Sequence, residues 1–225
     1  MDRRTFVLSG STAAAALAAG PAAADRLDKA RDTVEDSAAT LRDFADDDRF
    51  RGLARTAGRA KALVVLPTSV RAGFLIGASG GNGVMIARKG SDWSPPTFLR
   101  VSSVSFGFQA GGEIAQIVLA VMTERGGDQM LSTSVKLGAD LSIAAGPVGG
   151  GAKAQTADIL AYSKSQGLYG SVSVEGAVLK THNNWNEAYY RREVAPRDII
   201  LFGRVSNPQA APLRAAARAL VASRG

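Results

Sequence analysis

The chain lacks cysteine altogether and has a single histidine, His182, among its 225 residues. Without cysteine there is no disulfide framework, no thiol nucleophile, no thiolate metal site and no lipid-modified cysteine. One histidine rules out a metal site built from several imidazoles and leaves one candidate histidine base. These two absences argue against an enzyme, and we expect neither a metal nor another cofactor.

Acidic residues are outnumbered, at 20 against 27 Lys and Arg, which gives a net charge of +7. The charge is uneven: residues 25–48 hold nine acids and four bases, a net of −5, whereas residues 49–225 hold 21 bases and 10 acids, a net of +11. Basic proteins often bind nucleic acid, but here the arginines are dispersed, aromatics make up 6% and no recognition motif appears. The charge therefore favours another anionic partner, and we expect no nucleic acid.

Long hydrophobic runs are absent except near the N-terminus, where an Ala-rich stretch extends from Val7 to Ala19. Arg3-Arg4 precede it, and Ala22-Ala23-Ala24 follow it as a small-residue cleavage site. About 13 apolar residues are too few for a membrane span, so the pattern predicts a twin-arginine-type signal peptide over residues 1–24. We expect cleavage near Ala24 and a periplasmic protein, with retention of the segment as an anchor as the alternative.

The remaining residues, 25–225, are predicted to form a single domain. Apolar residues at helical spacing predict an amphipathic helix over residues 25–44, and a second helix is expected over residues 48–61, with the acidic residues 46–48 at its start. Short, Gly-rich connections between about eight apolar segments predict a β-rich body over residues 62–203, followed by a helix over residues 208–222. The expected fold class is α+β: an antiparallel sheet or barrel-like sandwich flanked by N-terminal helices and a C-terminal helix.

Within the β-rich body, four local expectations are specific. We expect a strand over residues 62–66 that ends at Pro67, and a hairpin turn at residues 80–83. Residues 136–145 and 170–179 are each expected to be a strand, as is the last apolar segment, residues 198–202. A short helix is expected over residues 182–190.

Two glycine-rich segments resemble catalytic or nucleotide-binding motifs. Gly77-Ala78-Ser79-Gly80-Gly81 matches the nucleophile elbow pattern, but an elbow requires a following helix and a partner base, and the next residues have the pattern of a strand. Residues 146–153 resemble a phosphate loop, yet Ala152 and Ala154 stand where the Lys and the Ser or Thr are required. A turn is the expectation for both, and a serine hydrolase using Ser79 and His182 is kept as an alternative.

Several segments in order resemble one family, the SYLF domain family. They are residues 60–67, 71–74, 80–84, 93–96, 107–111, 137–142, 145–149, 161–169, 173–176 and 198–203. The most specific of them runs Ala161-Tyr162-Ser163-Lys164-Ser165-Gln166-Gly167-Leu168-Tyr169. The resemblance covers residues 58–203 and implies a phospholipid-binding domain without established catalysis. In eukaryotic relatives it implies phosphoinositide binding, a basic amphipathic N-terminal helix and links to actin, and in bacterial relatives it implies export or a lipid anchor.

This sequence departs from that pattern because its first helix is acidic. We therefore predict that the protein adsorbs to anionic phospholipid, such as phosphatidylglycerol or cardiolipin, through basic residues further along the chain. The candidate lipid-binding residues are Arg49, Arg51, Arg55, Arg59, Lys61, Arg191 and Arg192. An ordinary solvated helix face is the other interpretation of the first five. An envelope structural or stress protein that binds another protein through its sheet remains the alternative function.

Overall fold

The computed structural model describes residues 21–73, 76–106, 111–146, 156–165 and 174–223. The helices are α1 (Pro21–Ala45), η1 (Asp48–Phe50), α2 (Arg51–Ala57), α3 (Glu124–Met130), α5 (Asn183–Tyr190), α6 (Pro196–Ile200), η2 (Pro208–Ala210) and α7 (Ala211–Ala222). The strands are β1 (Ala62–Gly73), β2 (Ile76–Lys89), β3 (Asp92–Trp93), β4 (Thr97–Phe106), β5 (Gly111–Val121), β6 (Ser134–Lys136), β7 (Ile143–Ala145), β8 (Ile159–Ser165) and β9 (Val178–Thr181). The expected α+β class is confirmed.

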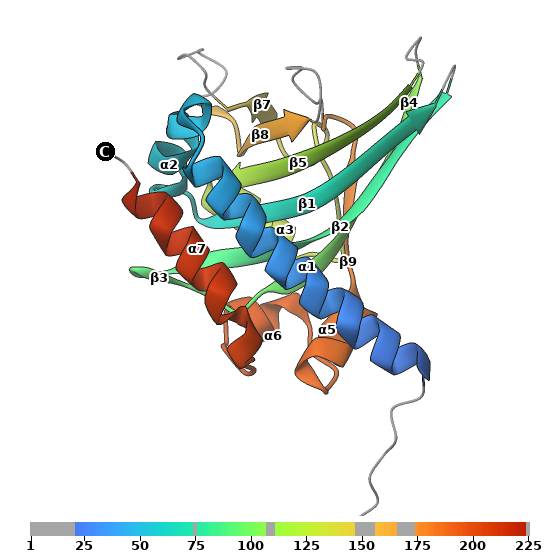
Figure 1. Cartoon of the computed structure of the whole chain (residues 1–225), viewed down its shortest axis with the longest axis vertical. Coiled ribbons are helices and arrows are strands. Elements are labelled where there is room, and N and C mark those ends of the chain that lie inside the picture. Colours follow the sequence, from blue (N-terminus) through green and yellow to red (C-terminus); the bar gives the residue numbers. More distant parts are fainter. Residues whose placement is uncertain (1–20, 74–75, 107–110, 147–155, 166–173, 224–225) are drawn as a thin grey trace, which may run out of the picture.

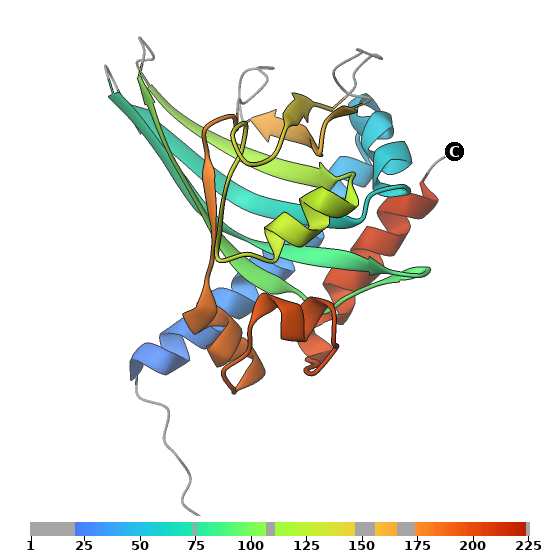
Figure 2. The ribbon, with the colours of Figure 1, turned by 180° about the vertical axis from the view of Figure 1, so that it is seen from behind.

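All described strands belong to one curled sheet (Figures 1 and 2). Its order is β6-β9-β4-β2-β1-β5-β8-β7, with β3 paired to the end of β2. Neighbours are antiparallel except β7 and β8, which are parallel. The edge strands β6 and β7 are joined by residues 137–142, within which Leu137 pairs with Leu141. Because the two edges are thus close together, the sheet must curl.

Helix α1 lies diagonally across one face of the sheet with α7 beside it, and the view from behind shows α3 on the other side (Figures 1 and 2). The apolar stripe of α1, at Ala30, Val34, Ala38, Leu41 and Phe44, is no more than 1% exposed. The three-four spacing of this stripe places it on one helix face, so the predicted amphipathic helix is confirmed. One hydrophobic core extends from this stripe through β1, β2 and β5 to α7.

Strand β1 continues through Pro67, so the expectation that it ends there is wrong. Its pairing with β2 moves from Val65–Val84 to Thr68–Asn82, which leaves two residues opposite Gly83. Proline lacks an N–H group, but a β-bulge leaves a residue outside the ladder and therefore tolerates it.

The hairpin expected at residues 80–83 is also wrong, because these residues lie in the middle of β2. A Cβ atom on Gly81 would lie 2.5 Å from the carbonyl oxygen of Thr68, and one on Gly83 would collide with the carbonyl of Val65. The glycines therefore allow β2 to approach the bulge closely rather than to turn.

Three further expectations need correction. Residues 198–202 are not a strand. Residues 198–200 belong to helix α6, which Pro196 begins, and Asp198 Oδ2 accepts a hydrogen bond from the N–H of Ala195 at 3.2 Å, while Ile199 and Ile200 are buried.

Residues 136–145 form two short strands rather than one, because Gly138 turns the chain with a φ of 85°. The second predicted helix is shorter than expected and divides into η1 and α2.

Two helices expected near the C-terminal end are confirmed, and one strand is not. The helix predicted over residues 182–190 is confirmed as α5, and the one over residues 208–222 as η2 and α7. The strand expected over residues 170–179 is wrong in its described part: residues 170–173 lie outside the described residues, residues 174–177 form a turn, and β9 begins only at Val178.

Candidate functional site

The first predicted basic cluster lies on η1, α2 and the turn that follows α2. Three of its five cations form ion pairs: Arg49 with Asp47 at 2.5 Å, Arg51 with Asp48 at 2.8 Å and Lys61 with Glu124 at 2.6 Å. Such exposed pairs add little stability. They do, however, reduce the positive charge that this end of the molecule presents to a partner.

Asp47 also caps η1, because its side chain accepts the backbone N–H of Arg49. The hydrogen bonds and charge of Arg49 hold the pKa of Asp47 well below its usual range. The expected role of the acidic residues 46–48 at a helix start is therefore confirmed, and the same contact neutralises Arg49.

The other two members of the cluster, Arg55 and Arg59, are exposed and form no ion pair among the described residues. Their charges act on the hydroxyl of Tyr162, which lies 2.7 Å from Thr56 Oγ1. Within the part of the chain that the structure describes, these two arginines are thus the members of the first cluster that no carboxylate pairs with.

The second predicted cluster, Arg191 and Arg192, is exposed where α5 ends. Arg191 has a φ of 56°, the left-handed conformation that ends the helix. Figure 1 places α5 and α6 at one end of the molecule and α2 at the other. The two predicted clusters therefore do not form one continuous surface.

An apolar tip that the sequence did not reveal is formed by Leu201 and Phe202, which are 48% and 62% exposed. The guanidinium of Arg204 lies 4.9 Å from the centre of the Phe202 ring, and Lys89 Nζ donates to the carbonyl oxygen of Leu201 at 3.1 Å. The sequence pattern predicts a strand for the apolar run that contains the tip, and only the formation of α6 separates its buried residues from its exposed ones.

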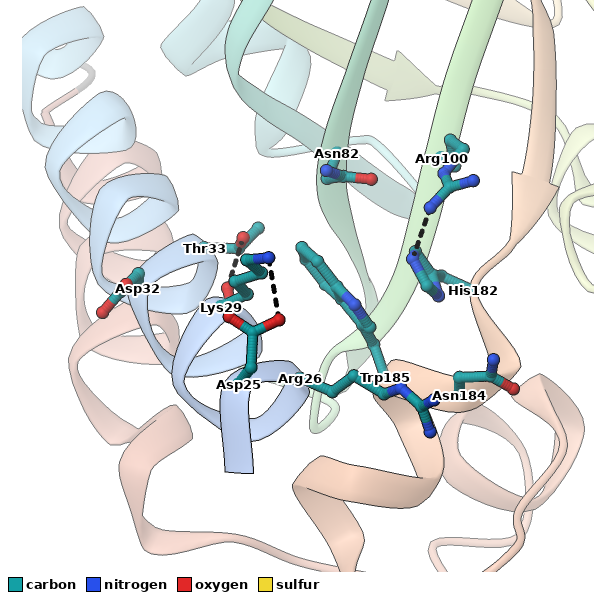
Figure 3. A pocket seen from close by; sticks show the side chains of 10 residues that line it. All are labelled: Asp25, Arg26, Lys29, Asp32, Thr33, Asn82, Arg100, His182, Asn184 and Trp185. Atoms are coloured by element: carbon teal, nitrogen blue, oxygen red, sulfur yellow. Dashed lines mark hydrogen bonds and ion pairs between the residues drawn. The ribbon is translucent and has the colours of Figure 1, made fainter. Parts of the chain in front are cut away.

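A second feature that the sequence did not reveal is a pocket of about 600 Å³ beside the first turns of α1 (Figure 3). Four segments far apart in the sequence line it: the start of α1, β2, β4 and the start of α5. Its polar and aromatic lining residues are Asp25, Arg26, Lys29, Asp32, Thr33, Asn82, Arg100, His182, Asn184 and Trp185.

One wall of the pocket is held by a hydrogen bond between Arg100 Nη2 and His182 Nε2 at 3.0 Å. Because a guanidinium can only donate, Nε2 must accept, and the imidazole is neutral with its proton on Nδ1. Burial lowers the pKa of His182 to about 4, and the charges of Arg100 and Arg26 act in the same direction. The ring also stacks on Trp185, with centroids 4.5 Å apart.

The geometry does not assemble a Ser79–His182 pair for a serine hydrolase. Ser79 lies in β2 opposite Ser103, and the two hydroxyls are hydrogen-bonded at 2.5 Å. The backbone N–H of His182 instead bonds Phe98, five residues from Ser103 and about 16 Å further along β4.

The described residues contain no group of three or more His, Asp or Glu side chains placed to hold a metal ion. Of the phosphate-loop-like segment, residues 147–153 lie outside the described residues. Within the described part of the chain, no helix is both long and apolar enough to cross a membrane.

Together, these observations define a curled α+β domain with separate basic surfaces, an apolar tip and an open pocket. A family model described as Ysc84, a Las17-binding protein actin regulator, matches residues 102–220, more than half of the chain. The chain belongs to this family, the SYLF family expected from the sequence segments. The family description names a binding protein and actin regulator rather than a reaction.

Curated relatives agree with the family match. The human SH3 domain-containing YSC84-like protein 1 is 32% identical over 162 residues, which cover 69% of this chain and 47% of the relative. LAS seventeen-binding protein 3 of Saccharomyces cerevisiae is 34% identical over 164 residues, covering 68% of this chain and 35% of the relative. The chain thus spans about half or less of the length of these relatives. No solved structure matches it.

Proposed function

We propose that this chain is a non-catalytic binding domain that adsorbs to membrane surfaces rich in anionic phospholipid. The observation that carries the proposal is the apolar tip, since Leu201 and Phe202 are the most exposed neighbouring pair of large apolar side chains in the described part of the chain. Two adjacent apolar side chains beside basic residues suit the boundary between lipid headgroups and acyl chains. The sequence-predicted Arg191 and Arg192 belong to the same end of the molecule.

The forces involved favour weak, reversible adsorption. Partial burial of Leu201 and Phe202 in the membrane contributes roughly 1–2 kcal/mol each. Each Lys or Arg held near an anionic surface adds about 1 kcal/mol, and Lys89, Arg191 and Arg192 are available for this. Arg55 and Arg59, at the other end, are less suited because their neighbours Arg49, Arg51 and Lys61 are already paired with carboxylates.

A vesicle co-sedimentation experiment tests the proposal. We expect binding to phosphatidylcholine vesicles that contain phosphatidylglycerol, weak binding to phosphatidylcholine alone, and a marked loss of binding as salt rises from low concentration to about 0.15 M. Equal and salt-insensitive binding to both kinds of vesicle would contradict the electrostatic part of the proposal.

We further propose that the chain is exported to the periplasm, where phosphatidylglycerol and cardiolipin are available. The support is the paired Arg3-Arg4 before an apolar run of signal-peptide length. Expression of the full chain should give a shortened product outside the cytoplasm, and a variant with Arg3→Lys and Arg4→Lys should stay inside. Full-length protein in the cytoplasm for both would contradict export.

A protein partner is the second candidate function, and one observation favours it. Val70 and Ile114 are paired across β1 and β5 and are 46% and 49% exposed, so they leave a small apolar area on the sheet. The yeast relative is named for binding LAS seventeen. The two candidates predict different losses: Leu201→Ser with Phe202→Ser should abolish vesicle binding, whereas Val70→Ser with Ile114→Ser should abolish capture of a protein partner.

A further inference from the structure

The apolar tip follows helix α6 through a turn whose backbone is hydrogen-bonded on both sides. The N–H groups of the two tip residues both donate to the carbonyl oxygen of Arg197, at 2.9 and 3.1 Å. Gly203 then has a φ of 58°, a left-handed conformation that glycine adopts without strain. The N–H of Arg204 donates back to the carbonyl oxygen of Asp198 at 2.9 Å. The backbone of the tip therefore has a fixed conformation.

Two side chains close the same turn. Arg204 Nη1 donates to Asp198 Oδ1 at 2.6 Å, and the other oxygen of this carboxylate accepts the N–H of Ala195 at 3.2 Å. One carboxylate thus joins the start of α6 to the residue after Gly203. We call the Asp198–Arg204 pair, with its backbone and side-chain hydrogen bonds, the clasp.

The clasp also contacts the aromatic ring of the tip. The guanidinium of Arg204 lies 4.9 Å from the centre of the Phe202 ring, a cation–π distance. A further contact comes from the end of β2, where Lys89 Nζ donates to the carbonyl oxygen of Leu201 at 3.1 Å. The ring is therefore held by the clasp, and the backbone of the tip is tied to the sheet.

A tip of this kind needs such support. Leu201 and Phe202 are about half exposed, and a flexible segment would bury them against the protein, because water disfavours exposed apolar surface. Reopening and ordering such side chains during binding weakens affinity by about threefold to tenfold. A tip that is already fixed in the exposed position avoids this loss.

We propose that the clasp positions the tip for membrane entry: Arg204 and Asp198 hold Leu201 and Phe202 in the geometry that enters an anionic phospholipid surface. The inference rests on the proposed membrane function and adds the residues that set the geometry of its site. Arg204 acts through its planar guanidinium, which bonds the carboxylate and stacks on the ring, rather than as one more positive charge. Asp198 favours binding through the clasp, although its charge alone opposes it.

The first test leaves the net charge unchanged. Arg204→Lys keeps the positive charge but loses the planar fork and the stacking surface. We expect the full chain with this change to bind vesicles containing phosphatidylglycerol about threefold to tenfold more weakly than the unmodified chain. The dependence on salt should be the same for both, because the charge is the same. Equal binding would show that Arg204 acts only as a charge, which overturns the proposal.

The second test compares two variants of equal charge, Asp198→Asn and Glu193→Gln. Glu193 is exposed between α5 and α6 and forms no ion pair among the described residues. Each change removes one negative charge, which alone strengthens adsorption about fivefold. Asparagine still offers an acceptor to the N–H of Ala195 but no charge to Arg204. Asp198→Asn should therefore bind about threefold to tenfold more weakly than Glu193→Gln, and equal binding overturns the proposal.

Amide hydrogen exchange without vesicles measures the clasp itself. The N–H groups of the tip and of Arg204 should exchange faster in Arg204→Lys and Asp198→Asn than in the unmodified chain or in Glu193→Gln. Circular dichroism should show that all three variants fold, and two independent clasp variants keep the test informative if one does not. Weaker vesicle binding without faster exchange overturns the proposal, because the loss would not arise from the geometry of the tip.

The outcomes separate this inference from the membrane function on which it rests. Vesicle binding by the unmodified chain, with no difference within either pair of equal charge, overturns the clasp proposal and leaves the membrane function intact. Absence of vesicle binding by the unmodified chain contradicts the membrane function and overturns the clasp proposal with it.

Discussion

Two glycines in the middle of β2 show how a single residue position can depend on a contact far away in the sequence. The segment Gly80-Gly81-Asn82-Gly83 has the composition of a turn, and the sequence alone predicted one. In the fold, Gly83 lies opposite the bulge around Pro67 and against the carbonyl of Val65. No local pattern reveals this contact, because it joins residues 18 positions apart. Glycine is required here because a Cβ atom would collide with the neighbouring backbone, and not because the chain turns.

We predict that Gly83→Ala destabilises the protein by about 2–3 kcal/mol, because the added Cβ overlaps backbone that cannot move without disturbing the sheet. Gly80→Ala is the matched control in the same strand: its Cβ would lie 3.6 Å from the carbonyl oxygen of Val101, an ordinary contact. Its stability should change by less than about 0.5 kcal/mol. Urea unfolding compares the two, and equal losses would contradict the steric account.

His182 should make stability fall in mild acid. Its pKa is about 4 in the fold, lowered by burial and by Arg100 and Arg26, against 6.5 for an unperturbed histidine. The unfolded chain therefore binds the extra proton between pH 6.5 and about 4, and the free energy of unfolding decreases as pH falls through this window. His182→Gln keeps an acceptor for Arg100 but cannot titrate. Unfolding measured from pH 7 to pH 4.5 should show a smaller decrease for this variant, and equal slopes would contradict the assignment.

At the scale of the elements, α7 is tied to the sheet through the short strand β3. Asp92 accepts a hydrogen bond from Arg218 Nη1 at 2.6 Å, another from Arg214, and one from the backbone N–H of Trp93 at 2.8 Å. Burial favours the neutral carboxyl, but these bonds lower the pKa of Asp92 on balance. The carboxylate therefore joins the C-terminal helix to the end of β2.

Asp92→Asn should cost about 1–2 kcal/mol at neutral pH, because it removes charge-assisted hydrogen bonds to two arginines. The control, Asp28→Asn, removes only an exposed pair with Arg31 at 3.5 Å within α1 and should cost less than about 0.5 kcal/mol. Hydrogen exchange should show faster opening of α7 in the first variant alone. Unchanged exchange in α7 would show that Asp92 does not hold this helix.

Elements with a long periodic pattern could be predicted, and elements decided by context could not. The stripe from Ala30 to Phe44 repeats over four turns and can only be buried as a helix. Residues 198–202 are apolar or acidic, a pattern that fits a strand as well as a helix. Pro196 at the first turn and the Asp198 carboxylate, which accepts the N–H of Ala195, favour the start of helix α6. The sequence predicts a shorter β1 because a proline such as Pro67 normally ends a strand. In the fold, a bulge accommodates Pro67, and this bulge involves the pairing with both neighbouring strands, which the local sequence does not reveal.

At the scale of the whole molecule, the candidate sites were only partly accessible from the sequence. The sequence names the basic residues as candidates but does not reveal their surroundings: Lys61 meets Glu124 from a distant segment, and Arg191 follows α5, which lies at the opposite end of the molecule from α2, the helix that contains Arg55. The pocket combines residues as far apart as Arg26 and Trp185, and only the folded sheet brings them together. Net charge alone therefore predicts an anionic partner but does not identify the surface that would bind it.

The proposed membrane function requires that the tip formed by Leu201 and Phe202 enters an anionic membrane. Because the chain has no cysteine, Leu201→Cys can be labelled at one position with an environment-sensitive fluorophore, and Ala219→Cys on the exposed face of α7 serves as the control. With vesicles containing phosphatidylglycerol, we predict a blue-shifted, brighter emission at position 201, a much smaller change at position 219, and little change at either with phosphatidylcholine alone. An unchanged spectrum at position 201 while the protein is bound to the vesicles would show that the tip does not enter the membrane.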